Sequence, residues 1–300
     1  MEDKSNDLSI IVLNFNGQQW LEKLLPSLKI NYLSKTTFQV EVVVVDNAST
    51  DPSISFLKTI DWIRLIESDR NGGFSFGNNL ALKDNRAKYV MLLNSDTEFT
   101  EENSNLDILI EYMNKHETAG IITPKVELTN GQPDRACHRG EPTLWAAFTY
   151  FMGLEKLFPK SRLFAKYHQS YKNLMEIHPI DACTGAAMLV RTSALEKVGL
   201  LDERFFMYAE DVDWCKRFRE TGYQIVYNPE VKIIHHKYKS GMGNSSKTAK
   251  SNATYWFYET MLQYYDKHYK DQYPGIFRDL LKLFISLKKG KQFASNYLKH

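Results

Sequence analysis

Short apolar runs alternate with helical patterns through the first part of the chain. Leu8–Leu13, Val40–Val45 and Tyr89–Leu93 are almost entirely apolar, which is typical of strands buried on both faces of a parallel sheet. Ile63–Ile66 is a shorter run of the same kind. Between the runs, apolar residues recur at helical spacing, as in Gln18–Leu28, where Pro26 predicts a kink or a break. This alternation predicts an α/β fold with a mainly parallel sheet.

Polar residues follow three of these strands directly. They are Asn14 and Asn16, then Asp46 and Asn47, then Asn94, Ser95 and Asp96. In open α/β sheets, ligands bind just beyond the carboxyl ends of the strands. Carboxylate and amide oxygens suit Mg²⁺ or Mn²⁺, which would in turn hold a diphosphate. Turn formation alone explains one such group, but three groups at one edge favour a nucleotide site.

Two further features of the sequence support a nucleotide site. Asp51 and Pro52 predict a helix start, with the aspartate as cap. Gly72 and Gly73 open the stretch Asn71–Asn79, which leads into a helix. Adjacent glycines let the backbone approach a ligand, and a helix N-terminus favours phosphate. Glycines of this kind are also common in plain loops, so this signal is weak alone.

The pattern is less regular from Thr129 to Pro179. Leu144–Phe158 is rich in aromatic residues, and we interpret it as a packed helix rather than an acceptor groove or a membrane contact. Arg135, His138 and Arg139 form a small basic group in a loop. These residues could meet phosphate, but we favour solvated surface.

Regular structure returns with small residues at Thr184–Ala187, which permit close approach of another group, and a strand from Met188 to Val190. Thr192 predicts the start of a short helix that ends at Gly199. Gln224–Tyr227 and Val231–Ile234 are predicted as two further short strands.

Acidic residues gather where a helix is predicted to begin, near Asp211. Glu210, Asp211 and Asp213 complement a helix dipole there, but one acid suffices for that role. The others therefore indicate a second function. His235 and His236 follow the last strand; beside an acidic edge, metal binding and plain surface are equally good interpretations.

The tail contains two helix candidates, Tyr255–Tyr269 and Ile276–Leu287. The second is amphipathic, with basic residues at Lys282, Lys288, Lys289 and Lys291. Such a helix can lie in a membrane interface. Packing on the rest of the protein is the slightly favoured alternative.

Composition narrows the class of protein. The chain has 300 residues, with 43% hydrophobic and 25% charged residues, as in ordinary soluble domains. A net charge of +2 gives no reason to expect nucleic acid as a partner. The polar, acidic N-terminus is no secretory signal, and no apolar run reaches the roughly 20 residues that a membrane span needs. Three scattered cysteines fit neither a metal site nor a disulfide set, so we expect a reducing cytoplasm.

In their order, these motifs resemble the family 2 glycosyltransferases, in particular their bacterial rhamnosyltransferase-like members. The resemblance runs from about Leu8 to about Ser240 and is carried by Val43–Asp51, Asn71–Asn79, Leu92–Asp96, Thr184–Met188 and Phe205–Asp213. It implies a GT-A fold, a mixed and mainly parallel sheet flanked by helices. We expect a catalytic domain at 1–240, with a nucleotide-sugar half (1–128) and an acceptor half (129–240), and a helical extension at 241–300.

The resemblance also implies roles for individual residues. The donor would be held by Asn14, Asn16, Asp46, Asn47, Asp51, Gly73, Asn78, Asn79, Asn94 and Ser95. Asp96 would be the main ligand of Mg²⁺ or Mn²⁺, in a motif whose first aspartate is here Asn94. His235 would be a further ligand, with His236 as the alternative. Asp211 would be the catalytic base, with Glu210 beside it, and Gly185 and Asp213 would face the acceptor.

These residue types suit an inverting sugar transfer. A positioned carboxylate can take the proton of an attacking hydroxyl, and a cation can stabilise the leaving diphosphate. We therefore expect transfer from a nucleotide diphosphate sugar, dTDP-rhamnose first, to a glycan or lipid-linked acceptor, by an enzyme that is cytoplasmic or peripheral at the inner membrane face. The alternatives are a nucleotidyltransferase, which would want a basic glycine-rich loop after the first strand, and a non-catalytic nucleotide-sugar binder, which would not need the acid cluster.

Overall fold

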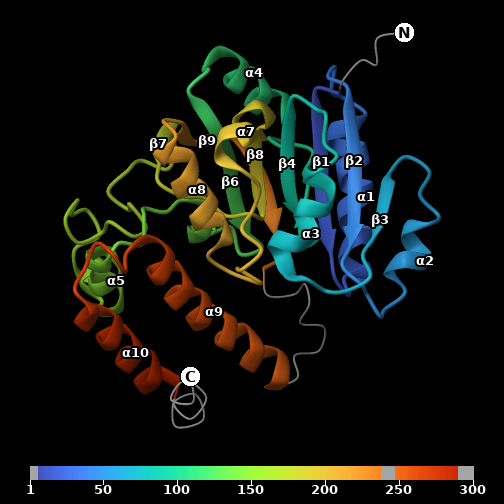
Figure 1. The fold of residues 1–300 in the computed structure, drawn as a ribbon. Coiled ribbons are helices and arrows are strands. Elements are labelled where there is room, and N and C mark those ends of the chain that lie inside the picture. The colour runs from blue at the N-terminus through green and yellow to red at the C-terminus, as the bar shows by residue number, and fades with distance from the viewer. Residues whose placement is uncertain (1–5, 238–246, 290–300) are drawn as a thin grey trace.

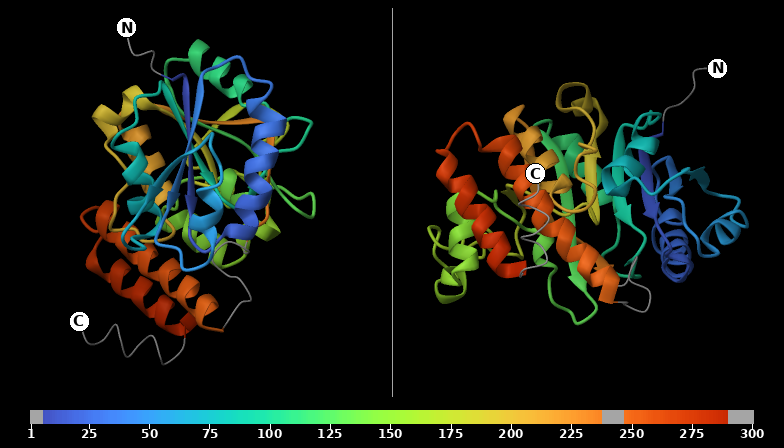
Figure 2. Two further views of the ribbon diagram at one scale, coloured as in Figure 1. Left: turned by 90° about the vertical axis from the view of Figure 1, so that its right-hand side faces the viewer. Right: turned by 60° about the horizontal axis from the view of Figure 1, so that its bottom comes forward.

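One sheet runs through the molecule, and helices cover both of its faces (Figure 1; Figure 2). The computed structural model describes residues 6–237 and 247–289. The first half of the sheet consists of four strands that are parallel, as predicted, and lie in the order β3-β2-β1-β4. They are β1 (Leu8–Asn14), β2 (Val40–Asp46), β3 (Arg64–Glu67) and β4 (Tyr89–Asn94).

Helices follow these strands, and the first of them has the bounds that its apolar periodicity predicted. They are α1 (Gln18–Leu28), α2 (Ser53–Leu57), α3 (Gly73–Leu82) and α4 (Asp107–Lys115). Pro26 does not end α1, which runs to Leu28 and continues as a π-helical turn over Lys29–Leu33. The buried side chains of β1, β4, α1 and α4 belong to one hydrophobic core.

The second half of the sheet is mixed. It contains β5 (Thr97–Glu98), β6 (Ala119–Leu128), β7 (His178–Ile180), β8 (Ala187–Arg191) and β9 (Gln224–His235). β8 lies antiparallel between β4 and β6, and β9 runs parallel to β6. The two strands predicted at the end of this region are in fact the single strand β9. Its ladder with β6 shifts register beyond Asn228, where Pro229 lacks a backbone N–H to donate.

The predicted strand tips do meet at one edge. Asn14 lies opposite Asp46, and Leu13 lies opposite Asn94, so the carboxyl ends of β1, β2 and β4 are level. This edge lies on the lower side of Figure 1. The remaining helices are α5 (Leu144–Phe151), α6 (Leu154–Leu157), α7 (Leu195–Val198), α8 (Glu210–Glu220), α9 (Lys247–His268) and α10 (Gly275–Lys289).

α9 and α10 form an antiparallel pair on the same lower side (Figure 1; Figure 2). Tyr264, Tyr265 and Tyr269, at the end of α9 and just beyond it, are buried in the hydrophobic core. α10 contacts α5 through the rings of Phe284 and Phe151, 4.7 Å apart. The predicted domain boundary at residue 240 and the basic residue Lys291 lie outside the described residues.

Candidate active site

Hydrogen bonds fasten the first two strand tips to each other. The Nδ2 atom of Asn14 donates to Asp46 Oδ2 at 2.8 Å, and the backbone N–H of Ser49 donates to Asp46 Oδ1 at 2.8 Å. The Oδ1 atom of Asn14 is buried and finds no partner in residues 6–237 or 247–289. It lies against Gly17, where an added Cβ would stand only 2.5 Å away. This edge therefore contains one buried acceptor atom whose hydrogen-bonding capacity is not used by the described residues.

The next two predicted donor residues close the loops beyond these tips. Asn16 Oδ1 accepts from the backbone N–H groups of Thr50 and Asp51, at 2.7 and 3.2 Å. The Asp51 carboxylate accepts from Gln18 N and Ser53 N, both at 3.1 Å. α2 begins at Ser53 with Pro52 as its N-cap residue, one position later than predicted, and the Asp51 carboxylate binds the first N–H group of both α1 and α2. Together these contacts make a rigid rim beside Asp46.

Gly73 of the predicted donor loop and Gly185 both lie directly against other protein atoms. Gly73 has φ +86°, and an added Cβ would lie 2.2 Å from the carbonyl oxygen of Phe206. The N–H of Phe74 donates to that same oxygen at 2.8 Å. An added Cβ at Gly185 would meet the Phe74 ring at 2.6 Å. The loop before α8 therefore packs directly on the start of α3 at Gly73, and the segment at Gly185 packs on the ring of Phe74.

Three asparagine side chains hold the segment around α3 in place by hydrogen bonds. Asn47 donates to Asn71 Oδ1 at 2.9 Å, and Asn78 donates to the carbonyl of Phe74 at 2.9 Å. Asn79 donates to Leu201 O at 2.9 Å and accepts from Leu201 N at 3.2 Å. All three are buried. They fix the walls of the site, and direct contact with a donor stays a prediction.

The third strand tip carries the metal-ligand candidates. Asn94 is half-buried, and Ser95 is buried beside Gly17. Asp96 Oδ1 lies 3.2 Å from His235 Nε2, because β5 and β9 pair at Thr97 and His235. His236 lies elsewhere, with Nε2 2.7 Å from Glu98 Oε2. Of the two histidines, the structure brings His235 to Asp96.

A second carboxylate, that of Asp134, contacts His235. The other ring nitrogen of His235, Nδ1, lies 3.1 Å from Asp134 Oδ2, and Lys237 donates to Asp134 Oδ1 at 2.7 Å. Burial disfavours a charged imidazole, yet the bonds to Asp134 and Asp96 raise the pKa of His235 to about 9. Burial likewise opposes ionisation of Asp134, but His235 and Lys237 lower its pKa below the usual range.

These residues fit a divalent cation in one defined way. Among the described residues, no three His, Cys, Asp or Glu side chains gather to hold a metal by themselves. Asp96 and His235 offer two metal-ligating atoms that face each other. Asp134 binds the other ring nitrogen of His235 and orients the imidazole. The remaining coordination positions would fall to water and to the phosphates of a nucleotide, which is how Mg²⁺ is usually held.

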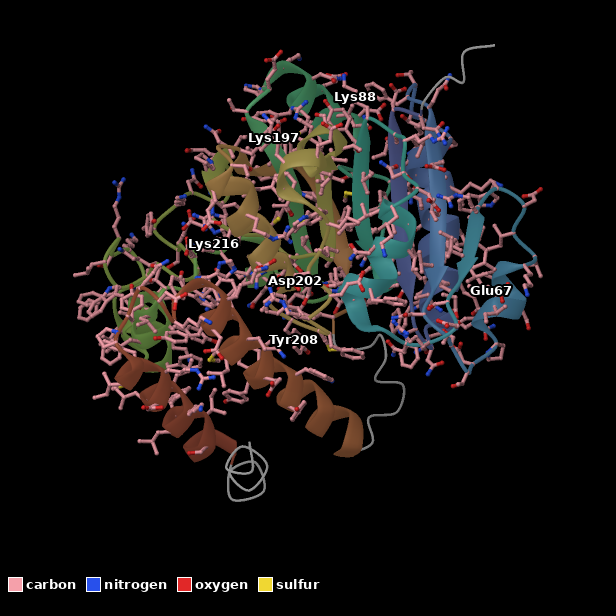
Figure 3. All side chains as sticks on the ribbon, viewed as in Figure 1. Glu67, Lys88, Lys197, Asp202, Tyr208 and Lys216 are labelled. Carbon is pink, nitrogen blue, oxygen red and sulfur yellow. The ribbon has the colours of Figure 1, made fainter. Side chains whose placement is uncertain are left out.

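The predicted helix start at the acid cluster is confirmed, since α8 begins at Glu210. Tyr208 and Ala209, directly before it, have φ angles of 71° and 65°. Residues other than glycine seldom adopt this left-handed conformation, and such strain tends to occur at functional sites. Figure 3 places Tyr208 between the lower edge of the sheet and α9.

Asp211 is held by an arginine from the irregular region. Its Oδ2 atom lies 2.5 Å from Arg139 Nη2, which also donates to the carbonyl of Cys183 at 2.8 Å. The Arg139 side chain is only 12% exposed, and His138 is buried too. The interpretation of these two residues as solvated surface was therefore wrong. The ion pair orients the carboxylate that the motif singled out as the base.

Glu210 has a different environment from its neighbour. It is buried, and its Oε2 atom has no hydrogen-bond partner within the part of the chain that the structure describes. Burial, and then the charge of Asp211, raise the pKa of Glu210 well above its ordinary value. Two adjacent carboxyl groups with such different surroundings are suited to different roles.

Asp213 binds the end of α9. Its carboxylate accepts from Lys267 at 2.5 Å and His268 at 2.8 Å, both on α9, and from Arg217 at 2.9 Å. Burial opposes ionisation, but His268 and Arg217 lower the pKa of Asp213. Because the side chain is fully buried, contact with an acceptor would require α9 to move.

The fold is that of the GT-A glycosyltransferases. Solved structures with this fold include residues 1–349 of TarS from S. aureus (TM-score 0.56, 17% identical, covering 92% of this chain and 69% of that one). Another is the mannosyltransferase PcManGT from Pyrobaculum calidifontis in complex with GDP-Man and Mn²⁺ (TM-score 0.56, 17% identical, 93% and 69% covered).

The sequence model of Glycosyl transferase family 2 matches residues 9–199, so the chain belongs to this family. Similar curated proteins include the low-salt glycan biosynthesis hexosyltransferase Agl10 of Haloferax volcanii, which is 28% identical over 77% of this chain and 68% of its own length. The N-acetylglucosaminyl-diphospho-decaprenol L-rhamnosyltransferase of Mycobacterium tuberculosis is 25% identical over 77% of this chain and 76% of its own. The predicted enzyme class, a glycosyltransferase that uses nucleotide sugars, is confirmed.

Proposed function

We propose that this glycosyltransferase is inverting and metal-dependent. The observation that carries the proposal is the facing pair of Asp96 and His235, placed at the same sheet edge as Asn14 and Asp46. A divalent cation held there would stabilise the charge that develops on the leaving diphosphate. Asp46 and the buried acceptor atom of Asn14 would bind the nucleoside at the neighbouring strand tips.

Asp211 supplies the base in this scheme. As the acceptor hydroxyl oxygen bonds to the anomeric carbon, the bond from that carbon to the diphosphate oxygen breaks, and the hydroxyl proton passes to the Asp211 carboxylate. Attack on the face opposite the leaving group inverts the configuration, so no second carboxylate is needed as nucleophile. Arg139 holds Asp211 in one orientation, which supports its use as a positioned base.

Names of relatives suggest the substrates. The M. tuberculosis relative is named for L-rhamnose transfer to a diphospho-decaprenol acceptor. We therefore propose dTDP-rhamnose as donor and a lipid-linked saccharide as acceptor, with the enzyme working at the cytoplasmic face of a membrane.

A panel of nucleotide sugars tests the donor. We expect dTDP-rhamnose to raise the melting temperature more than UDP- or GDP-sugars do at the same concentration, since a ligand that binds only the folded state stabilises it more the tighter it binds. Slow donor hydrolysis that needs Mg²⁺ or Mn²⁺ should accompany binding. Stabilisation without hydrolysis or transfer would indicate a non-catalytic binder, and release of pyrophosphate from a nucleoside triphosphate would indicate a nucleotidyltransferase.

Asp134→Asn should weaken Mn²⁺ binding by about 10- to 100-fold, the usual effect of removing the carboxylate behind a metal-binding histidine. The asparagine keeps the size of Asp134 but no longer accepts the His235 N–H with a full charge. Titration calorimetry with Mn²⁺ and a nucleoside diphosphate measures the effect without turnover. Glu98→Gln is the matched control, because Glu98 bonds to the other histidine, His236. An equal loss in both variants would contradict the assignment.

A further inference from the structure

The helix α5 is built with its large side chains outward. Its inner positions, Ala146 and Thr149, are small and fully buried. Trp145 and Phe148 are 40% and 50% exposed, and Met152, just beyond the helix, continues the same stripe. The interpretation of this aromatic stretch as packed core was therefore wrong for its outer face. In water, burying these aromatic side chains would give a lower free energy than exposing them, so their exposure indicates an interaction surface.

The exposed apolar side chains extend past α5 into the next segment. We call them the α5–α6 surface: Trp145, Phe148, Met152, Leu157, Phe158 and Leu163. Ring contacts keep it in shape, because Phe164 lies 6.3 Å from Trp145 and 5.3 Å from Phe158. The surface is therefore a fixed feature of the fold.

α10 extends this surface. Ile276, Leu280 and Leu283 are spaced on one face of the helix and are more than half exposed. The Phe151–Phe284 contact joins α10 to α5. Both helices lie on the lower side of Figure 1, where the carboxyl edge of the sheet and the candidate active site also lie.

Charge indicates what covers the surface. Lys156, Lys160, Arg162 and Lys166 are exposed among the apolar residues of the α5–α6 surface. Between residues 142 and 175 the single acid is Glu155, which is buried and lies 2.6 Å from His168. In the α5–α6 surface, alternating basic and apolar side chains without an exposed acid match the interface of an anionic bilayer, and α10 adds one exposed acid, Asp279. A second copy of the chain would instead bring like charges together.

We propose that the α5–α6 surface, together with the outer face of α10, docks the enzyme on an anionic phospholipid membrane. Leu157 and Phe158 enter the boundary between headgroups and acyl chains, and Lys160 and Arg162 pair with lipid phosphates. Among the described residues no helix is long and apolar enough to span a bilayer, so the contact is interfacial. Docking in this orientation turns the active-site edge toward the lipid surface.

Vesicle flotation with the full chain tests the proposal without reference to activity. We expect binding to vesicles of phosphatidylcholine with phosphatidylglycerol, weaker binding to phosphatidylcholine alone, and release at high salt. Leu157→Ser with Phe158→Ser should lower the partition coefficient at least about tenfold, and so should Lys160→Glu with Arg162→Glu. Since all four residues are exposed, the variants should fold, which thermal unfolding checks.

Two control variants complete the design. Ile30→Ser removes a side chain that is 64% exposed on the segment after α1, and Lys115→Glu reverses a charge on α4. Both should bind vesicles like the unchanged protein. The proposal is overturned if the unchanged protein ignores anionic vesicles, or if the surface variants bind as well as the controls. It is also overturned if light scattering shows that the protein is a dimer that does not bind lipid, and that Leu157→Ser with Phe158→Ser converts this dimer to a monomer.

Discussion

Asp211→Asn should lower kcat by about 10²- to 10⁴-fold or more, with donor affinity nearly unchanged. The amide cannot take the proton of the acceptor hydroxyl, whereas the donor contacts at the tips of β1, β2 and β4 remain intact. Steady-state kinetics at saturating acceptor, together with a donor-binding isotherm, separate these two effects.

The structure adds a condition to this experiment. Asp211 and Arg139 form a largely buried ion pair, and removing one charge of such a pair typically costs about 3–5 kcal/mol. Thermal unfolding must therefore show that Asp211→Asn is folded at the assay temperature. Glu210→Gln is the matched comparison, because Glu210 lies next in the chain but makes no bond to Arg139. If Asp211→Asn kept near-normal kcat while Glu210→Gln abolished it, the base would be Glu210.

The strand tips were predictable because their signals are local. A buried parallel strand needs a continuous apolar run, and β1, β2 and β4 begin at the predicted residues and end one residue later. Parallel neighbours then place their carboxyl ends level, so Asn14, Asp46 and Asn94 meet without further information. The start of α8 was predictable for the same reason, from acids followed by an apolar stripe.

The partners of the site residues were not predictable in this way. Arg139 is 72 positions from Asp211, and Asp134 is 101 positions from His235. Both come from the stretch between β6 and β7, where there is no periodicity to place a side chain. A charged residue in an irregular segment is usually solvated, which is why the basic group was taken for surface. Only the fold shows that it is not.

α5 shows a second limit. Leu144–Phe151 is apolar almost throughout, so the pattern predicts a helix without marking which face is covered. In the structure, small residues face inward and aromatic residues outward. Similarly, His235 and His236 are adjacent in sequence, and only the pairing of β5 with β9 decides which of them faces Asp96.

Asp96→Asn should lower kcat at least about 10²-fold at a fixed concentration of Mg²⁺ or Mn²⁺, since a bound cation contributes several kcal/mol of charge stabilisation. Asparagine is the right replacement. Asp96 is only 1% exposed, so its side chain is enclosed by protein. Alanine would leave a cavity beside His235, whereas the isosteric amide removes mainly the charge that attracts the cation.

The two histidines provide the internal control for this prediction. His235→Gln should share the loss of activity and of Mn²⁺ binding, because its Nε2 faces Asp96 at 3.2 Å. His236→Gln should retain both, since its ring contacts Glu98 and Trp20 instead. Calorimetry with Mn²⁺ ranks the three variants independently of turnover. Full activity of Asp96→Asn in excess chelator would exclude a metal at this strand tip. An equal loss in His236→Gln would mean that the site is held by β9 as a whole rather than by the Asp96–His235 pair.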